Sequence, residues 1–269
     1  MAVITISRGS YNRGKEVAEK VAEKLGYKCI SRGLLLEVSK RYNIPEVKLV
    51  HAIHDAPNIL DRFNHKKDKY IAFIKSALLN QFKEDNIVYH GLAGHFFVRH
   101  IPHALKVRVI SDMDDRVQSE MERKGVNESK ARRILEKDDK QRREWSKDLY
   151  GIDTADPSLY DLVVHIKQLN VDDAVDLICD TVSKPSFQTT KESQRMLEDM
   201  ATSAAIQKVL MDVERDIKVC VDRQTAYIET QSALGAEESL VKEIREVTET
   251  FDEISDIKIE CHPIVALSE

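Results

Sequence analysis

The sequence lacks any apolar run approaching the roughly 20 residues that would span a bilayer, so no transmembrane segment is expected. Its first residues show neither a positively charged segment nor a small-residue cleavage site, so no secretion signal is expected. The four cysteines are scattered and form neither a CxxC pair nor a zinc spacing. These absences predict a cytoplasmic protein with reduced, buried thiols.

The sequence also lacks a basic excess. Its 41 Lys and Arg residues face 46 Asp and Glu residues, which gives a formal net charge of −5. This balance argues against a nucleic-acid partner, although a few local cations can still hold a phosphate group. What is present is enough apolar material for a real core, 42% of 269 residues, in a length that accommodates two domains.

The first part of the chain alternates short strands with helices. Apolar, β-branched runs predict strands at residues 3–6, 27–30, 86–90, 106–110 and 162–164. Helical spacing of apolar residues predicts helices at 15–25, 114–124, 128–148 and 171–182, and residues 33–83 read as mostly helical. Strands that are apolar rather than alternating indicate a parallel sheet covered on both faces.

A change of composition predicts a domain boundary. We expect a first domain at residues 1–183, a linker without periodicity at 184–192 and a second domain at 193–269. The second domain reads as helix 193–213, strands 217–221 and 226–230, helix 237–254 and strand 257–261. This α-β-β-α-β order is a small α+β unit, in which an apolar stripe on the second helix forms core rather than a partner groove.

The stretch after the first strand fits the phosphate-loop pattern GxxxxGK, with Gly9, Gly14 and Lys15 in place. In such a loop, successive backbone N–H groups wrap an anion and the following helix adds its dipole. Lys15 would reach the terminal phosphates, whereas Glu16 replaces the Ser or Thr that normally binds magnesium. The alternative is an ordinary strand–turn–helix with a solvated lysine. The candidate nucleotide-binding residues are Gly9, Ser10, Tyr11, Asn12, Arg13, Gly14, Lys15 and Glu16.

Further segments follow this loop in a recognisable order. They are Ile6-Ser7-Arg8, Lys15-Glu16-Val17-Ala18, Asp55-Ala56-Pro57, the strand 86–91, the charged helix 134–147, Tyr150-Gly151, Asp156-Pro157 and Tyr160-Asp161-Leu162-Val163. Over about residues 1–182 this order resembles the cytidylate kinase-like family of P-loop nucleoside monophosphate kinase relatives.

The resemblance implies an α/β fold with a parallel five-stranded sheet flanked by helices, ATP with Mg²⁺ as cofactors, and a nucleoside monophosphate as acceptor. It assigns catalysis to Lys15, Arg142 and Arg143, because arginines on a lid helix would cover the transferred phosphoryl group. It assigns the acceptor side to Arg8, Arg32, Asp55 and Lys140. The alternative for the lid is a salt-bridged surface helix, because acidic residues lie among these bases.

The chain departs from the family pattern at three places. Tyr11, Asn12 and Arg13 stand where small residues are usual, Ser31 replaces an Asp before Arg32, and Leu92 replaces an arginine that helps hold the acceptor phosphate. These departures put CMP as acceptor in doubt and leave two alternatives open: a nucleotide-binding sensor with weak catalysis, and a purely structural α/β protein.

Four histidines, at 90, 95, 100 and 103, gather close to Leu92. The five-residue spacing of the first two is not a helical ligand pair, so no metal site is predicted. The second domain resembles a BON-like domain in its pattern of elements. We expect it to act as a regulatory or oligomerising module, which makes a homodimer one option.

Overall fold

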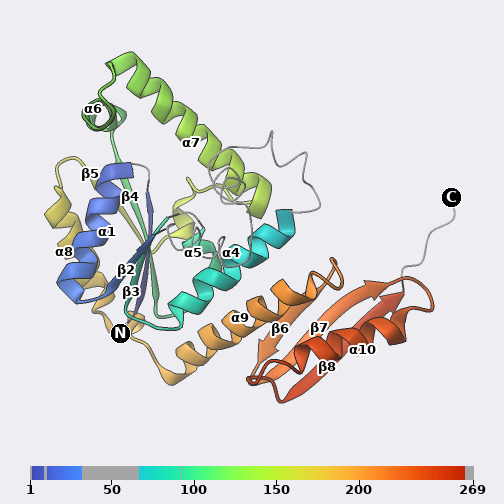
Figure 1. Ribbon diagram of the computed structural model, residues 1–269. Coiled ribbons are helices and arrows are strands. Elements are labelled where there is room, and N and C mark those ends of the chain that lie inside the picture. Colours follow the sequence, from blue (N-terminus) through green and yellow to red (C-terminus); the bar gives the residue numbers. More distant parts are fainter. Residues whose placement is uncertain (1, 9–10, 32–66, 92, 264–269) are drawn as a thin grey trace. The chain divides into compact units, whose positions relative to one another are not determined.

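The computed structural model describes residues 2–8, 11–31, 67–91 and 93–263 (Figure 1). The chain divides into two compact units, one of Met1–Lys67 with Glu84–Thr190 and one of Asp68–Lys83 with Lys191–Glu269. Within the described ranges, no helix combines the length and the apolar composition that crossing a membrane requires.

The first unit is built on a five-stranded parallel sheet with the order β2-β3-β1-β4-β5. This architecture confirms the fold expected from the alternating pattern. Parallel strands end at the same edge, so the residues that follow all five strands gather there. The strands are β1 (Val3–Arg8), β2 (Lys28–Ser31), β3 (Ile87–His90), β4 (Ala104–Ser111) and β5 (Leu162–Ile166).

Helices cover both faces of this sheet (Figure 1). Ile4 and Ile6 of β1 are buried in one cluster with apolar residues of α1 (Tyr11–Leu25) and α8 (Val171–Val182). The short helix α5 (Gly94–Phe97) contacts β1 on the other face. α8 begins at the residue the sequence predicts because Asn170 caps it, accepting hydrogen bonds from two backbone N–H groups.

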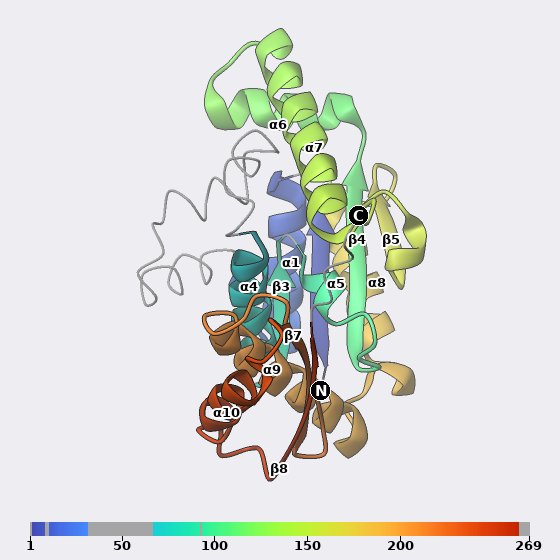
Figure 2. The ribbon, with the colours of Figure 1, turned by 90° about the vertical axis from the view of Figure 1, so that its right-hand side faces the viewer.

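Two helices follow β4 and lie beyond its carboxyl end (Figure 2). α6 (Met113–Lys124) ends at Gly125, which adopts a left-handed conformation with φ 63°. α7 (Glu128–Tyr150) begins after Asn127, whose side chain accepts a hydrogen bond from the Lys130 backbone. Val117, Ala131 and Leu135 form a small apolar cluster of their own. A single turn of 3-10 helix, Pro157–Leu159, precedes β5.

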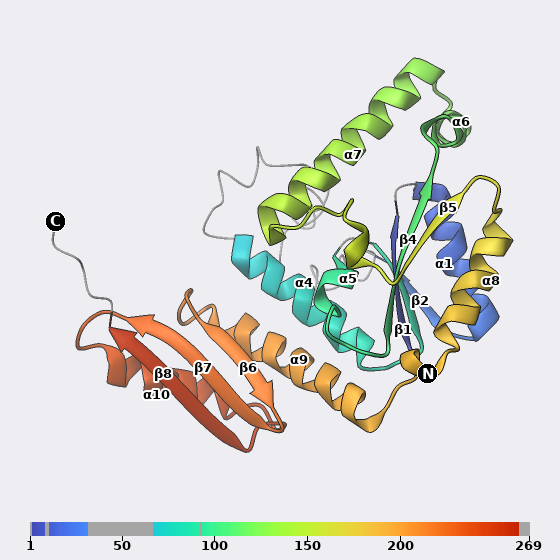
Figure 3. The ribbon, with the colours of Figure 1, turned by 180° about the vertical axis from the view of Figure 1, so that it is seen from behind.

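The second unit has the α-β-β-α-β order expected from the sequence (Figure 3). Its elements are α9 (Lys191–Leu210), β6 (Lys218–Asp222), β7 (Thr225–Ser232), α10 (Glu237–Thr248) and β8 (Asp256–Pro263). The sheet has the order β6-β7-β8, with an antiparallel and a parallel pair. The resemblance to a BON-like domain stays a prediction.

The apolar stripe on α10 is core, as predicted. Ile244 is fully buried, and Leu240 and Val247 pack against the same cluster. The helix ends at Thr248, whereas the sequence predicted residue 254. The prediction was too long because Phe251 and Ile254 continue the apolar spacing and pack on the core from a turn. Ahead of this unit, the predicted linker contains one 3-10 turn, Pro185–Phe187.

Helix α4 (Lys67–Phe82) belongs to the second unit, although it precedes β3 in the chain. The ion pair of Lys69 with Asp212 joins its first turn to the region after α9. Lys208 lies 5.7 Å from the centre of the Phe73 ring, and Gln194 Nε2 donates to the Lys83 carbonyl at 3.0 Å. These contacts arrange α4 and α9 antiparallel, which nothing in the sequence pattern indicated.

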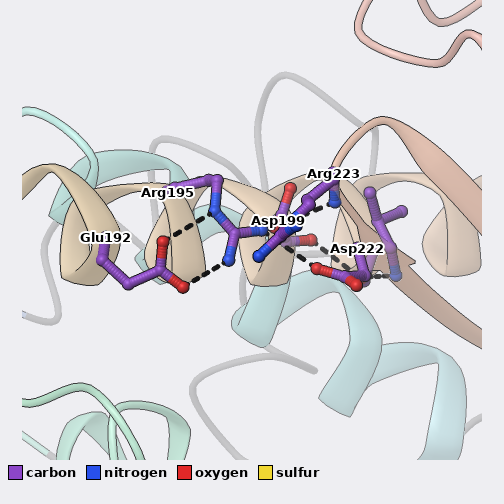
Figure 4. Close-up of polar contacts among 7 residues, drawn as sticks. Glu192, Arg195, Asp199, Asp222 and Arg223 are labelled. Atoms are coloured by element: carbon purple, nitrogen blue, oxygen red, sulfur yellow. Dashed lines mark hydrogen bonds and ion pairs between the residues drawn. The ribbon is translucent and has the colours of Figure 1, made fainter.

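The hairpin between β6 and β7 turns through two residues with positive φ, Arg223 at 47° and Gln224 at 67°. Two left-handed residues are what a two-residue hairpin turn requires, and neither is glycine here. Polar contacts hold the turn against α9 (Figure 4): the Arg223 N–H donates to Asp199 Oδ2 at 3.3 Å, and Arg195 Nη1 lies 2.9 Å from Asp222 Oδ1. The contacts therefore stabilise a turn that is conformationally costly for these side chains.

Candidate active site

The junction between β1 and α1 stands at the carboxyl edge of the parallel sheet. β1 ends at Arg8 and α1 begins at Tyr11, so the helix starts before Lys15, where the apolar spacing predicted it. The prediction missed this first turn because its residues are mostly polar, and the spacing of apolar residues cannot detect a polar turn. The first backbone N–H groups of a helix have no carbonyl partner within it, so the amides of residues 11–14 offer an anion site.

Lys15 lies in the first turns of α1 with its side chain 48% exposed. Its ammonium is 3.3 Å from Glu19 Oε1, while Glu16 Oε1 is 3.5 Å from Lys20 Nζ. Exposed pairs with this i,i+4 spacing contribute only about 0.3–0.5 kcal/mol. Lys15 can therefore exchange Glu19 for a phosphate group at little cost.

Several predicted site residues lie outside the described residues: Gly9, Ser10, Arg32, Asp55 and Leu92. Nothing is described of the side chains of Arg8, Tyr11 and Asn12. Gly14 is buried within α1, and Arg13 beside it is half-buried. The nucleotide-binding and acceptor-binding roles of this set stay predictions.

The predicted lid residues lie on α7. Lys140 is 76% exposed and its ammonium is 3.6 Å from Glu144 Oε1, Arg143 is exposed, and Arg142 is half-buried. The helix therefore has the salt bridges of the surface-helix alternative and also presents basic side chains.

Asp139 has a specific role that the sequence did not indicate. Its two carboxylate oxygens accept hydrogen bonds from Arg116 of α6 at 2.7 and 2.8 Å. The Arg116 side chain is only 9% exposed, so this two-bond pair is largely removed from water. Such a fork-to-carboxylate contact fixes angle as well as distance. It locks the helix that carries Arg142 and Arg143 against α6.

Replacing Asp139 with asparagine is expected to lower the free energy of unfolding of the first unit by about 2 kcal/mol, because the buried guanidinium of Arg116 loses its counter-charge. The single tryptophan of the chain, Trp145, lies in α7, so its fluorescence during urea unfolding measures this change. Asp138→Asn, the same substitution at an exposed position one residue earlier, should change stability by no more than about 0.5 kcal/mol. Equal effects of the two substitutions would contradict the anchoring role.

A buried polar cluster lies at the carboxyl end of β1. The Tyr160 hydroxyl is 3.0 Å from the Thr154 carbonyl oxygen and 3.3 Å from both Ser7 Oγ and His95 Nε2. A phenol has one hydrogen to donate, and the carbonyl can only accept, so the Tyr160 O–H donates to Thr154. The phenol oxygen is then left to accept from Ser7 or His95. Arg108 Nη1 donates to the same Thr154 carbonyl at 2.5 Å.

His95 is held neutral within this cluster. Its side chain is 4% exposed, and its ring stacks on Tyr160 with the ring centres 4.9 Å apart. Burial, together with the nearby Arg108 and Lys106 cations, lowers the pKa of the His95 imidazole to about 3. In the sequence analysis His95 was weighed only as a possible metal ligand. Within the described residues, no group of three or more His, Cys, Asp or Glu side chains could hold a metal ion.

The turn after β3 is shaped by Tyr89. A Cβ at Gly91 would lie 2.4 Å from the Tyr89 hydroxyl oxygen, and a Cβ at Gly94 would lie 2.4 Å from its Cδ1. Glycine at both positions therefore leaves room for a tyrosine that is 1% exposed. This packing gives a structural reason for the two glycines after β3.

Comparisons with known proteins relate the chain to one family. A family model described as the cytidylate kinase-like family matches residues 3–168. A cytidylate kinase of Sulfolobus acidocaldarius is 27% identical over 68% of this chain and 96% of its own length. One of Pyrobaculum aerophilum is 28% identical over 71% of this chain and 99% of its own length. A crystal structure of an uncharacterised protein from Eubacterium ventriosum matches 68% of this chain and all of its own with a TM-score of 0.51 and 25% identity.

Proposed function

Because the chain belongs to the cytidylate kinase-like family, we propose that it transfers the terminal phosphoryl group of ATP to a nucleoside monophosphate. The family match and the cytidylate kinase relatives support a nucleotide kinase-like role. The observation that carries the finer proposal is the junction of β1 with α1, where a strand of a parallel sheet leads into a helix with Lys15 in its first turns. A strand that leads into a helix N-terminus is also the setting in which P-loop proteins bind nucleotide phosphates, whereas here residues 11–15 belong to α1 rather than to a loop.

In the proposed reaction, an oxygen of the acceptor's phosphate forms a bond to the γ-phosphorus of ATP. The bond from that phosphorus to the bridging oxygen of the β-phosphate breaks, which yields ADP and a nucleoside diphosphate. Little covalent work falls to the protein, so its residues act by positioning and by neutralising charge. The amides at the start of α1 and the Lys15 ammonium would hold the β- and γ-phosphates of ATP, and Arg142 and Arg143 of α7 would stabilise the charge on the transferred group.

The chemistry that magnesium would supply when bound with ATP is neutralisation of part of the phosphate charge. Glu16 stands where a hydroxyl is usual, and in the structure its carboxylate faces Lys20 at 3.5 Å. Carboxylate oxygens are ordinary ligands for Mg²⁺, but a carboxylate cannot take over the role of the usual hydroxyl unchanged, so Glu16 stays a departure from the pattern.

CMP is the first acceptor to test, because the relatives are cytidylate kinases. Ser31 and Leu92 remove a carboxylate and a guanidinium that the family pattern provides on the acceptor side. Loss of one charged partner to phosphate corresponds to about 1.5–3 kcal/mol of binding. We therefore expect a high KM for CMP or a preference for another monophosphate.

A coupled assay that follows ADP release tests the proposal with ATP, Mg²⁺ and a panel of CMP, dCMP, UMP, AMP and GMP. The expected result is turnover with at least one acceptor and none when the acceptor is omitted. No turnover with any of them at high enzyme concentration would refute the kinase activity. If calorimetry then still measured ATP binding, the sensor alternative would account for the chain, and absence of binding as well would leave a structural α/β protein.

A further inference from the structure

The second unit contains a cleft of about 530 Å³ between α4, the end of α9 and the strands β6 and β7. Small-molecule sites have volumes of about 300–1,000 Å³, so the cleft is large enough for a metabolite. One face of α4 lines it through Asp68, Ile71, Ala72 and Lys75, which follow helical spacing. α9 contributes Gln207, whose Nε2 donates to the Ile217 carbonyl at 3.1 Å.

Lys75 is a cation without a matching anion in this cleft. Its side chain is half-buried, and burial lowers the pKa of its ammonium. The Cys220 thiol, in contrast, raises the pKa of Lys75. Among the described residues, no carboxylate forms an ion pair with Lys75. Removing an ammonium group from water is costly unless an opposite charge accompanies it.

A second lining residue, Thr230 on β7, also has an unused polar group. It is 1% exposed, and its Oγ1 has no hydrogen-bond partner among the described residues. Buried hydroxyls are nearly always paired, so one that is unpaired beside a cleft indicates a ligand atom at that place. A hydroxyl donor and an ammonium on the walls of one cleft match the oxygens of an anionic group.

The other charged groups of the lining limit the kind of anion. Lys218 and Glu229 neutralise each other at 3.2 Å, Arg215 adds a positive charge, and Asp68 and Asp216 add negative charges. The cations and carboxylates of the lining balance, so the cleft has no excess positive charge that would attract a polyanion. A ligand with one anionic group and further hydroxyl or amino groups would place the anion at Lys75 and donate hydrogen bonds to the carboxylates.

A second cleft of the same unit contains a cation whose ionic partners are all supplied by the chain. It is lined by Arg195 and Asp199 among others, and there Arg195 meets Glu192, Asp199 and Asp222 at 2.6, 2.8 and 2.9 Å (Figure 4). The chain itself supplies all the anions that this guanidinium can use. Lys75 has no such set.

We propose that the cleft between α4, α9 and β7 binds a small organic anion through the Lys75 ammonium and the Thr230 hydroxyl. The anionic group is a carboxylate or a phosphate ester, and both present the same oxygen acceptors. The site lies wholly within the second unit, outside the residues that the family model matches from 3 to 168 apart from those of α4. It uses none of the residues assigned to the proposed phosphoryl transfer.

Methyl NMR spectroscopy of the full chain tests the proposal with two probes, inorganic phosphate and lactate, at matched ionic strength. Methyl groups of Ile71, Met211 and Ile217 line the cleft, whereas those of Ile4 and Ile6 lie in the first unit. The expected result is a saturable shift of the cleft methyls with at least one probe. A response to phosphate alone indicates a phosphate ester as natural ligand, and a response to lactate alone indicates a carboxylate.

Variants then assign the binding to the two side chains. Lys75→Gln should weaken probe binding about tenfold or more, and Thr230→Val about threefold to tenfold. Lys242→Gln, on the exposed surface of α10, is the control and should leave binding unchanged. If Lys75→Gln does not fold, Thr230→Val and the wild-type titration still test whether the probe binds in the cleft. Cleft methyls that respond to neither probe, or that respond equally in Thr230→Val and wild type, would overturn the proposal.

Discussion

Replacing Lys15 with methionine is expected to lower kcat/KM for phosphoryl transfer by about 10²–10³, while the protein stays folded. Methionine keeps the length of the side chain and removes only the charge that the reaction needs at the terminal phosphates. Among the residues that the structure describes, the Lys15 ammonium forms its ion pair with an exposed glutamate, Glu19, at 3.3 Å. The substitution should therefore cost no more than about 0.5 kcal/mol of stability.

Lys24→Met provides the matched control, because Lys24 lies on the same helix α1 and has the same kind of exposed partner, Asp176 at 2.6 Å. It stands a further nine residues along the helix and has no place in the proposed site. Steady-state kinetics with the best acceptor of the panel should show wild-type values for this control. A Lys15→Met enzyme with unchanged kcat/KM would mean that the junction of β1 and α1 does not hold the transferred phosphate.

The stability of the first unit is expected to fall steeply in acid because of His95. The folded state holds this imidazole at a pKa of about 3, whereas in the unfolded chain it has its ordinary value near 6.5. Between these values the unfolded state binds the proton and the folded state does not. The free energy of unfolding therefore drops as pH falls through this window, with a limiting slope of about 1.4 kcal/mol per pH unit from His95 alone.

His95→Gln should flatten this part of the pH profile, because glutamine preserves a hydrogen-bonding nitrogen near the Tyr160 hydroxyl and does not titrate. Urea unfolding followed by Trp145 fluorescence at several pH values between about 4 and 7 measures the difference from wild type. Carboxylates contribute to the slope of both proteins and cancel in the difference. His100→Gln, at an exposed position, is the control and should leave the profile unchanged. Parallel profiles for His95→Gln and wild type would show that His95 is charged in the folded state.

Local patterns predicted most of the secondary structure and the fold class. The helix Val171–Val182 was predicted to the residue from its apolar spacing, and in the structure Asn170 caps its first turn. The end of α6 followed from Gly125, whose left-handed conformation stops a helix. The apolar character of the strands predicted a parallel sheet because strands covered on both faces have no polar side. These features depend on residues close together in the chain, so they can be read from the sequence.

The tertiary structure decided which distant residues meet. Ser7, His95 and Tyr160 come from three separate segments, and nothing in the sequence around any of them marks a shared hydrogen-bond cluster. The pairing of Arg116 with Asp139 could not be predicted from the sequence either, because charged residues on a helix have many candidate partners. The packing of α6 against α7 determines which two residues meet.

The assignment of α4 shows the same limit. Its sequence predicted a helix and indicated no partner, because the apolar and polar positions of a helix determine a buried face but not the element that covers it. Only the packing against α9 placed it in the second unit and created the cleft with Lys75. The sequence by itself determined most of the elements, their order and the Gly-Lys pair that follows the first strand, which the structure places in α1. The contacts between segments, and with them the two polar sites, depended on the fold.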